Sequence, residues 1–395
     1  MYDAIIVGAR CAGSSLAMLL ARRGARVLVV DRATFPSNIP HGHFVHRHGP
    51  KRIQRWGLLD KVAAASKPVT SMLTDFDDFP LVAHDLEVDG VAWGYGPRRA
   101  ALDKILVDAA AGSGAEVRES LNVDEFIFEG GRMVGVRGHT SSGTRIEERA
   151  TITVGADGRN SHLARAVGAE VYNQTPPLLC YYFSYWSGVQ SEDFELHTRP
   201  AQRRAVFAHR TSDDLFAIFV GLPVSELPEM RSDLEASFLR VLDGMGDLGA
   251  RVRAGSREER FYGASDLPNF YRRPYGPGWA LVGDAGLHKD PYLALGICDA
   301  LRDAEFLAEA ISDGLEGTRR MEESLASFEQ RRNEASEADY AENLTAARLE
   351  PLPDQVYTLR AAVRSDREAT RRLMLVRNGM LDPAEGFSPH ELQPL

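Results

Sequence analysis

The chain has 395 residues, 44% of them hydrophobic, which is enough for two packed domains or one large domain with insertions. Its formal net charge is −10 without a long basic run, which argues against general affinity for nucleic acid and favours a small-molecule ligand. No stretch approaches the roughly 18 apolar residues of a membrane helix, no signal-like leader precedes the first apolar run, and the three cysteines lie far apart; we therefore expect a cytoplasmic protein without an integral membrane segment.

Residues 1–31 predict a strand, a glycine turn, a helix and a second strand. The apolar run DAIIV starts the unit, and ARVLVVDR predicts a buried parallel strand that ends at Asp31. A unit of this kind that closes within about 30 residues is the context that a dinucleotide-binding Rossmann motif requires. In the turn, Gly8 and Gly13 occupy the first and last positions of G-x-G-x-x-G, but the middle position holds Arg10.

The rest of the chain alternates between helical and strand-rich segments. The expected elements are a helix (50–65), an antiparallel excursion (70–95), a helix followed by a strand (98–119), a meander of strands (123–158), an aromatic, strand-rich segment (177–223), a helix with a charged face (224–242), a short buried strand ending in glycine (276–286) and a strongly periodic helix (296–315).

This order predicts an α/β fold with mixed α+β character. We expect a discontinuous, Rossmann-like nucleotide-binding domain with a parallel sheet, an inserted antiparallel-sheet domain for the substrate, and C-terminal helices. The predicted boundaries are 1–70, 98–170 and 274–318 for the nucleotide-binding domain, 71–97 and 171–273 for the substrate domain, and 319–395 for the C-terminal helical region.

Two later motifs strengthen the nucleotide-binding prediction. TVGADGRNSHLAR (153–165) closely resembles the DG fingerprint of FAD-dependent aromatic hydroxylases, and WALVGDAGLHKDPYLALGICDALRDA (279–304) resembles the GD fingerprint of the same flavoproteins. With the glycine turn, they make most of residues 1–320 similar to the flavoprotein superfamily of para-hydroxybenzoate hydroxylase-type monooxygenases, geranylgeranyl reductases and flavin-dependent halogenases. The resemblance implies that the discontinuous domain is an FAD-binding domain.

The resemblance also implies which residues hold FAD. Gly8, Gly13 and Asp31 would hold the ADP half, Asp157 would lie near the pyrophosphate, and Asp284 would bind the ribityl chain. The guanidinium of Arg10 would either face the phosphates or the flavin rim, or point to solvent. The full implied set is Gly8, Arg10, Gly13, Asp31, Arg32, Arg47, Arg99, Val123 (through its backbone), Asp157, Gly158, Gly283, Asp284, Pro291, Gly296 and Ile297.

Several residues are candidates for acid–base work. HGHFVHRH contains His41, His43, His46 and His48, but this spacing fits no closed metal site and no cysteine or acidic ligand is near, so we expect no metal. In the superfamily this loop runs between flavin and substrate, which makes His43 or His46 a candidate acid or base.

Further candidates follow the GD fingerprint. His288 and Asp290 are comparable candidates for acid–base work, with a solvated loop as the alternative. Pro291 matches the proline beside the reacting face of the flavin. The helix that starts near Gly296 would aim its amides at the pyrimidine edge of the ring, where partial positive charge stabilises reduced anionic flavin.

The strand LLCYYFSYWSGV carries the candidate substrate residues. Strand alternation places Tyr181, Phe183 and Tyr185 on one face and Tyr182, Ser184 and Trp186 on the other. The first face would line a pocket for a planar or apolar substrate. Ordinary core packing is an equally good explanation of each side chain taken singly.

The resulting hypothesis is a monooxygenase that binds FAD, is reduced by NADH or NADPH, and reacts with molecular oxygen. A flavin C4a-hydroperoxide would transfer one oxygen atom to a small aromatic or polyketide-like substrate. The alternatives are an FAD-dependent alkene reductase of the geranylgeranyl reductase type and a non-catalytic flavin-binding protein. A halogenase is disfavoured because the W-x-W-x-I-P stretch is absent. The sequence leaves open the substrate, the choice of reductant and the oligomeric state.

Overall fold

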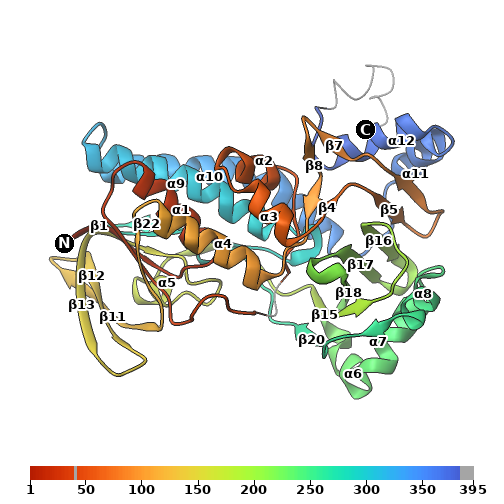
Figure 1. Cartoon of the computed structure of the whole chain (residues 1–395), viewed down its shortest axis with the longest axis horizontal. Coiled ribbons are helices and arrows are strands. Elements are labelled where there is room, and N and C mark those ends of the chain that lie inside the picture. Colours follow the sequence, from red (N-terminus) through yellow and green to blue (C-terminus); the bar gives the residue numbers. More distant parts are fainter. Residues whose placement is uncertain (40–41, 383–395) are drawn as a thin grey trace. The chain divides into compact units, whose positions relative to one another are not determined.

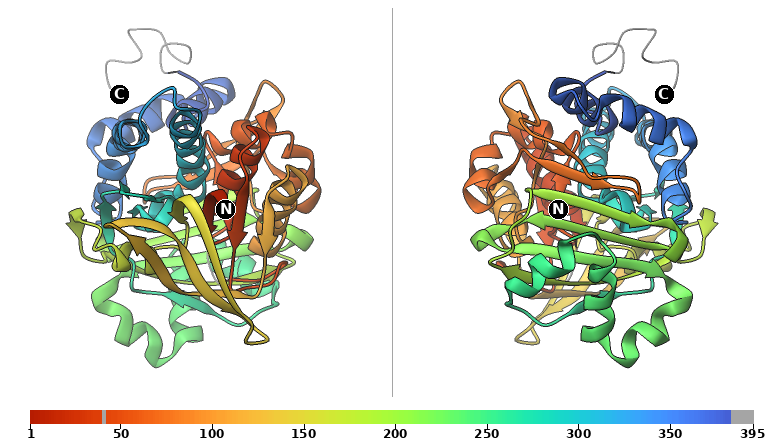
Figure 2. Two further views of the ribbon diagram at one scale, coloured as in Figure 1. Left: turned by 90° about the vertical axis from the view of Figure 1, so that its left-hand side faces the viewer. Right: turned by 90° about the vertical axis from the view of Figure 1, so that its right-hand side faces the viewer.

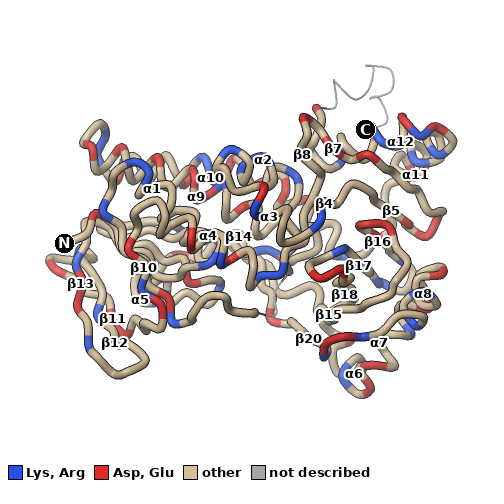
Figure 3. Tube along the Cα trace, in the orientation of Figure 1, with Lys and Arg blue, Asp and Glu red and all other residues tan. Residues whose placement is uncertain are grey.

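The computed structural model describes residues 1–39 and 42–382, and the chain divides into two compact units (Figure 1). Unit 1 comprises residues 1–41, 99–176 and 268–341, and unit 2 comprises residues 42–98, 177–267 and 342–395. Acidic and basic residues are interspersed along both units (Figure 3).

Unit 1 is built on a sheet whose centre is parallel. Its strands follow the order β10 (Glu116–Arg118), β2 (Val27–Val30), β1 (Tyr2–Val7), β13 (Arg145–Gly155), β12 (Arg132–Thr140) and β11 (Leu121–Glu129), with β23 (Trp279–Leu281) also paired to β13 and β22 (Tyr275–Gly276) to β23. The pairs of β1 with β2 and with β13 are parallel, whereas β11, β12 and β13 form an antiparallel meander. Every residue of the apolar strand β2 is buried, as expected for a parallel sheet covered on both faces.

Helices complete unit 1. Helix α1 (Cys11–Arg22) packs against both α4 (Arg99–Gly112) and α9 (Gly296–Glu316) (Figure 2). The remaining elements are α5 (His162–Ala166), β14 (Val171–Thr175), β21 (Asn269–Arg272), β24 (Leu287–His288), the short 3₁₀ helices η4 (Gly283–Ala285) and η5 (Pro291–Leu293), and α10 (Met321–Ala346), whose last residues belong to unit 2. The buried Arg332 of α10 donates to the carbonyls of Arg272 and Gly286 and so fixes the chain after η4.

Unit 2 contains an antiparallel sheet with one parallel addition. Its main strands are β15 (Leu179–Ser187), β18 (Phe216–Pro223), β17 (Arg204–Arg210), β16 (Phe194–Arg199), β5 (Met72–Asp75) and β6 (Leu81–Ala83), with β19 (Ser256–Arg257) and β20 (Tyr262–Ala264) paired to β15. Only the β5 and β16 pair among these is parallel.

Helices and smaller sheets surround this sheet within unit 2. The helices are α2 (Gly49–Arg55), α3 (Leu59–Ala65), η1 (Pro200–Gln202), η2 (Ser212–Asp214), η3 (Val224–Glu226), α6 (Leu227–Ser232), α7 (Leu234–Asp243), α8 (Leu248–Ala254), α11 (Asp354–Val363) and α12 (Arg367–Arg377); the short strands are β3 (Val45–His46), β4 (Pro68–Val69), β7 (Glu87–Val88), β8 (Val91–Ala92) and β9 (Gly94–Tyr95). Trp186, Phe238 and Leu242 belong to the apolar core that joins β15 to α7.

Residues 50–65, which the sequence predicts to be helical, form two helices, because α2 ends before Gly57, whose φ of +74° separates it from α3. The units also group some residues differently from the predicted domain boundaries. Residues 42–70 group with unit 2 rather than with the nucleotide-binding segments, since both β3 and β4 pair with β9. Residues 342–382 also belong to unit 2.

Arg360 anchors α11 to β5. Its side chain is 3% exposed and makes an ion pair with Asp78 at 2.8 Å. The same guanidinium donates to the Thr74 hydroxyl at 2.7 Å and to the carbonyls of Thr74 and Phe79. This buried cation therefore organises the chain around the end of β5.

A buried charge network lies where β16 meets β5. His197 contacts the carboxylate of Glu195 at 2.8 Å and that of Asp75 at 3.5 Å, and all three residues are buried. Arg199 pairs with Asp75, and Arg251 pairs with Glu195. Burial opposes charge on the imidazole, but the two neighbouring carboxylates outweigh it and raise the pKa of His197.

We expect the His197→Gln variant to lose a pH-dependent part of the folding free energy. Because the folded pKa of His197 lies above its ordinary value of 6.5, the stabilisation is fully present below about pH 6.5 and is lost as the pH rises through the folded pKa. Urea unfolding from pH 6 to 9 should show the wild type approaching the variant as the pH increases. His139→Gln, at an exposed pair with Asp124, is the control and should keep the wild-type profile. Parallel pH profiles for wild type and His197→Gln would contradict this assignment.

Candidate functional site

The three fingerprint segments contact one another at the start of α1. An added Cβ at Gly8, whose φ is +106°, would lie 2.4 Å from the carbonyl oxygen of Ala156 in the DG segment. A Cβ at Gly13 would lie 1.8 Å from the carbonyl oxygen of Gly8, and one at Gly283 would lie 2.9 Å from the Cβ of Ala12. Unit 1 therefore brings together segments from three distant parts of the sequence, and only glycine permits these approaches.

The turn before α1 fits a phosphate-bearing ligand. No acidic side chain stands in the first turn of α1, and no side chain caps its first amides. Such a helix start carries partial positive charge. Asp31, at the end of β2, accepts hydrogen bonds from the amides of Ala9 and Ala33, both at 2.8 Å, so its carboxylate is fixed beside the same turn. Arg32 is exposed.

The DG segment supplies a buried acceptor. Asp157 Oδ2 accepts from the amides of His162 and Leu163 at the start of α5, at 2.6 and 3.3 Å. Its Oδ1 is buried without a hydrogen-bond partner among the described residues, which suits a ligand that brings a donor such as a hydroxyl group. Gly158, with φ of +77°, has open space at its Cβ position. Val123 lies on β11, half-buried.

The GD segment leaves room in front of α9. Asp284 is half-buried and lies close enough to Arg99 to help raise the pKa of that guanidinium. Gly296 is exposed at the start of α9, and a Cβ there would meet only Asp284 Oδ1, at 3.9 Å. Pro291 is exposed and Ile297 is half-buried. Behind them, Lys289 pairs with Asp299 at 2.7 Å, which ties the loop to the first turn of α9.

Arg10 does not extend into solvent. Its guanidinium makes an ion pair with the fully buried Asp103 of α4 at 2.7 Å, and its side chain is only 25% exposed. The solvent-facing alternative is therefore wrong. Its other predicted role, at the phosphates or flavin rim, stays a prediction.

His288 and Asp290 are buried, so the solvated-loop alternative is wrong for both. His288 Nδ1 bonds the carbonyl of Pro268, and the ring stacks on Phe270. Because a carbonyl only accepts, Nδ1 carries the proton of the neutral ring, and Nε2 is its acceptor nitrogen. Asp290 Oδ1 accepts from the amide of Tyr292 at 3.0 Å, which caps η5 and gives this carboxylate a structural role.

The described histidines of the histidine-rich loop, His43, His46 and His48, belong to unit 2. His43 is fully buried, with Nε2 3.1 Å from the Thr211 hydroxyl, which itself donates to the carbonyl of Gly96. His43 Nε2 therefore donates to the Thr211 hydroxyl, which makes Nδ1 the acceptor nitrogen of the neutral imidazole. His46 packs against Phe44 and Trp93.

Other members of this loop have different placements. Arg47 adopts a left-handed φ of +49° and lies 3.7 Å from Glu342. His41 lies outside the described residues. No group of three His, Cys, Asp or Glu side chains within residues 1–39 and 42–382 could hold a metal ion.

The candidate substrate residues form part of an aromatic cluster in unit 2. We define this aromatic cluster by six residues: His43, Phe183, Tyr185, His209, Phe219 and Tyr262. Phe183 stacks on Phe219 at 4.6 Å and on Tyr262 at 5.3 Å, while His43 lies 4.9 Å from His209. Tyr181 shares this face of β15, whereas Tyr182 and Trp186 pack into the opposite core.

The aromatic cluster is mostly buried, and two guanidinium groups lie over its rings, that of Arg98 over Tyr185 and that of Arg260 over Tyr262. Burial raises the pKa of Tyr185 to about 12 and lowers that of His209 to about 4, so both groups are neutral at physiological pH. The guanidinium of Arg98 lies 3.8 Å over the Tyr185 ring and pairs with Glu259. Arg98, His209, Phe219 and Tyr262 were not among the residues that the sequence motifs indicated. The alternation of β17 and β18 was the only signal for His209 and Phe219.

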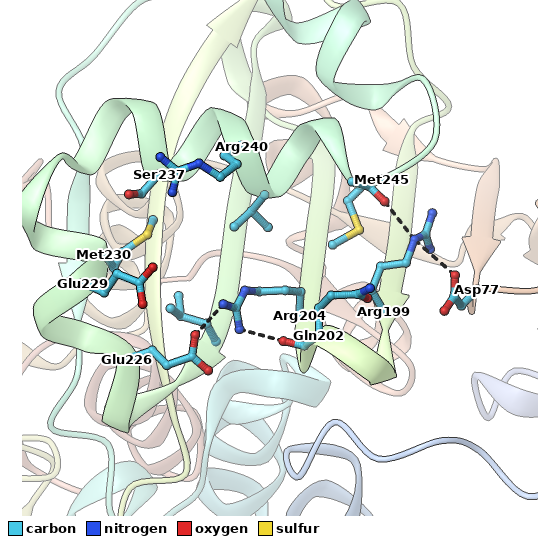
Figure 4. A pocket seen from close by; sticks show the side chains of 13 residues that line it. Asp77, Arg199, Gln202, Arg204, Glu226, Glu229, Met230, Ser237, Arg240 and Met245 are labelled. Atoms are coloured by element: carbon cyan, nitrogen blue, oxygen red, sulfur yellow. Dashed lines mark hydrogen bonds and ion pairs between the residues drawn. The ribbon is translucent and has the colours of Figure 1, made fainter.

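A separate groove of about 450 Å³ lies elsewhere in unit 2 (Figure 4). Two of its arginines already have partners, because Arg199 pairs with Asp75 and Asp77 and Arg204 pairs with Glu226. Its lining contains none of the predicted site residues. Within the described part of the chain, no helix is both long and apolar enough to cross a membrane.

The comparisons with known proteins agree with this geometry. Residues 1–226 match the family model described as FAD binding domain. The chain is 27% identical over 368 residues to digeranylgeranylglycerophospholipid reductase 1 of Methanopyrus kandleri, covering 89% of this chain and 91% of the relative.

Solved structures share the fold at lower identity. The myxobacterial chondrochloren halogenase CndH has a TM-score of 0.79 at 21% identity and covers 100% of this chain and 95% of its own. Pseudomonas aeruginosa PqsL in complex with 2-aminobenzoylacetate has a TM-score of 0.74 at 21% identity, covering 94% and 99%. The predicted fold class and superfamily are confirmed, and since the family match spans more than half of its length, the chain belongs to the FAD binding domain family and is an FAD-dependent oxidoreductase.

Proposed function

We propose that the protein is a monooxygenase that uses FAD, NADH or NADPH, and O2 to oxygenate a small aromatic or polyketide-like substrate. The observation that carries the proposal is the aromatic cluster, in which Phe183, Tyr185 and Phe219 present planar surfaces, with Tyr185 and Phe219 beside His43. PqsL, which shares the fold, has been solved with a small aromatic keto acid. The balanced reaction takes up NAD(P)H, a proton, O2 and substrate, and releases NAD(P)⁺, water and the oxygenated product.

Unit 1 supplies residues that fit FAD. FAD, when bound, supplies two-electron redox chemistry and oxygen activation. The glycine turn and the start of α1 would hold its pyrophosphate, and Asp31 would bind the ribose hydroxyls. Asp157 Oδ1 would accept from a hydroxyl group, and Asp284 would bind the ribityl chain. Gly296 would let the backbone of α9 approach the ring. Arg32, Arg47, Arg99 and Val123 keep their proposed contacts with the ADP half or the flavin.

Unit 2 supplies the residues that we assign to the substrate. Stacked rings of the aromatic cluster would orient a planar molecule and exclude water. His43 is held by Thr211, and we assign its imidazole as an acid or base toward the substrate. In unit 1, His288 Nε2 is the corresponding proton site, fixed by the bond from Nδ1 to Pro268. His46 and Asp290 are further candidates, although the carboxylate of Asp290 also caps η5.

The test is a substrate panel with oxygen controlled. Purified protein with bound FAD is mixed with hydroxybenzoates, aminobenzoyl acids and polycyclic aromatics, and NADH or NADPH oxidation, O2 uptake, peroxide and product are measured. A true substrate should accelerate reductant oxidation, with one O2 consumed per product and little peroxide. Product formation in anaerobic solution, or none with any aromatic compound, would contradict the proposal.

The second candidate is an FAD-dependent alkene reductase. The observation that favours it is the nearly full-length similarity to digeranylgeranylglycerophospholipid reductase 1. That activity adds two electrons and two protons across a carbon–carbon double bond and needs no O2. Anaerobic reduction of a prenyl lipid by dithionite-reduced protein would therefore select this candidate.

We expect Tyr185→Ala to raise the KM for an aromatic substrate by about tenfold or more, because one buried ring contact is lost. FAD content should stay unchanged. Steady-state kinetics check the result, and Tyr185→Phe, which keeps the ring, should restore a KM close to wild type. Tyr182→Phe is the control on the opposite face of β15, where its hydroxyl accepts from Arg231 at 2.7 Å. Equal KM values for Tyr185→Ala and wild type would remove the aromatic cluster from the substrate site.

A further inference from the structure

Asp103 collects three side chains around one buried carboxylate. It lies on α4 with no exposed surface, and its oxygens contact Arg10 Nη1 at 2.7 Å, Arg99 Nη2 at 2.9 Å and Cys11 Sγ at 3.3 Å. Burial raises the pKa of Cys11 to about 12, so the thiol is a neutral donor. The carboxylate therefore joins the first residues of α1 to the first turn of α4 through charge-assisted bonds.

Arg10 occupies the middle glycine position of the fingerprint. Its backbone has φ of −93° and ψ of −161°, so this position needs no glycine conformation. What glycine provides there is the absence of a side chain, which lets the pyrophosphate approach the backbone. A long side chain is compatible with that approach only where it is directed elsewhere.

The side chain of Arg10 is directed elsewhere by several contacts. Besides the ion pair with Asp103, Nη2 lies 3.3 Å from the Ser37 hydroxyl, and the guanidinium lies 5.4 Å over the Phe35 ring. These partners come from α4 and from the chain after β2, all within unit 1. Arg10 is thus held at its tip, and the strongest contact is the one to Asp103.

We propose that Asp103 is a positioning residue that holds the Arg10 side chain out of the approach of the FAD pyrophosphate, so that the Arg10–Asp103 pair does the work of the missing glycine. The same carboxylate orients Arg99, which couples the glycine turn to the start of α4. The proposal rests on FAD as the bound group and does not depend on oxygenation. It applies equally to a monooxygenase and to an alkene reductase.

Two substitutions of Arg10 form a matched pair. Both Arg10→Gly and Arg10→Leu remove the ion pair, and they differ only in whether an unheld side chain remains. We expect Arg10→Gly to bind FAD within about threefold of wild type and Arg10→Leu to bind about tenfold or more weakly. Titration of apoprotein with FAD by fluorescence, and with ADP by calorimetry, measures both; ADP reports the pyrophosphate site without the flavin.

A double variant tests Asp103 itself. Asparagine has no charge and only one acceptor oxygen, so Asp103→Asn loses the ion pair with Arg10 and one of the two oxygens that the guanidinium groups share. We expect it to weaken FAD and ADP binding by about tenfold, and we expect Arg10→Gly/Asp103→Asn to recover at least half of that loss on a logarithmic scale. Simple loss of helix packing at α4 would not be rescued by removing Arg10. Asp103→Glu, which keeps the charge, should bind more tightly than Asp103→Asn.

Two outcomes of the Arg10 pair overturn the proposal. If Arg10→Gly weakens binding as much as Arg10→Leu, Arg10 is itself a phosphate ligand. If both match wild type, the side chain is irrelevant to binding. If Asp103→Asn unfolds, the comparison of Arg10→Gly with Arg10→Leu decides whether the proposal holds, since both variants leave Asp103 in place. Failure of wild-type protein to bind FAD or ADP would instead contradict the family assignment, which separates the two questions.

Discussion

Alanine at Gly13 is expected to abolish FAD binding and to destabilise the protein. The new Cβ would lie 1.8 Å from the carbonyl oxygen of Gly8, and a backbone atom cannot move aside as a flexible side chain would. Helix α1 would have to shift away from β1, which disrupts the turn that is to hold the pyrophosphate. Overpacking of this kind costs about 1–3 kcal/mol or more. We expect FAD affinity to fall by about 100-fold or more.

Gly112 provides the matched control for this prediction. It lies at the end of α4, has no left-handed backbone angle, and a Cβ there would meet no atom within 4 Å. Gly112→Ala should keep wild-type FAD affinity and be as stable as wild type or more so, because alanine favours helix. Thermal unfolding and FAD titration compare the two variants. A Gly13→Ala protein that binds FAD normally would show that α1 is not packed as described.

Arg360→Ala is expected to destabilise the protein by about 3–5 kcal/mol, because a buried ion pair loses one partner and leaves the other uncompensated. The Arg360 side chain is 3% exposed and that of Asp78 is 14% exposed. The loss also removes the bonds to Thr74 and Phe79. Urea unfolding gives the free-energy difference.

The control for this prediction is a neighbouring exposed pair. Arg367 of α12 lies 2.8 Å from Asp85, but the two side chains are 76% and 69% exposed. Surface pairs contribute about 0–1 kcal/mol, so Arg367→Ala should be close to wild type. An equal loss of stability in both variants would mean that burial does not set the contribution of Arg360.

The glycine turn of unit 1 could be predicted because local constraints specify it. Gly8 and Gly13 are required by contacts between a strand and the helix that follows it, and such requirements are visible in a short stretch of sequence. The periodic pattern of 296–315 likewise predicted α9, and alternation along 179–187 separated Phe183 and Tyr185 from Tyr182 and Trp186.

Other features depend on partners far away in the sequence. Residues 42–70 belong to unit 2 because the two-residue strands β3 and β4 pair with β9. No local sequence pattern predicts strands as short as these. The role that we propose for Asp103 depends on its contact with Arg10, which lies 93 positions earlier in the sequence. His209 and Phe219 join the aromatic cluster through strand pairing that the sequence alone does not specify. Periodicity reports which face is buried, and it does not report which residues meet there.

Strand β13 has a consequence for biosynthesis. It pairs with β1 from the beginning of the chain and with β23, which is completed only at residue 281. Unit 2 also draws on three separated segments, the last of which starts at residue 342. Contacts of such high sequence separation form late and slowly. Both units therefore remain incomplete while the chain is still being synthesised. The glycine turn before α1 can thus make all of its contacts with the later segments only after most of the protein has been synthesised.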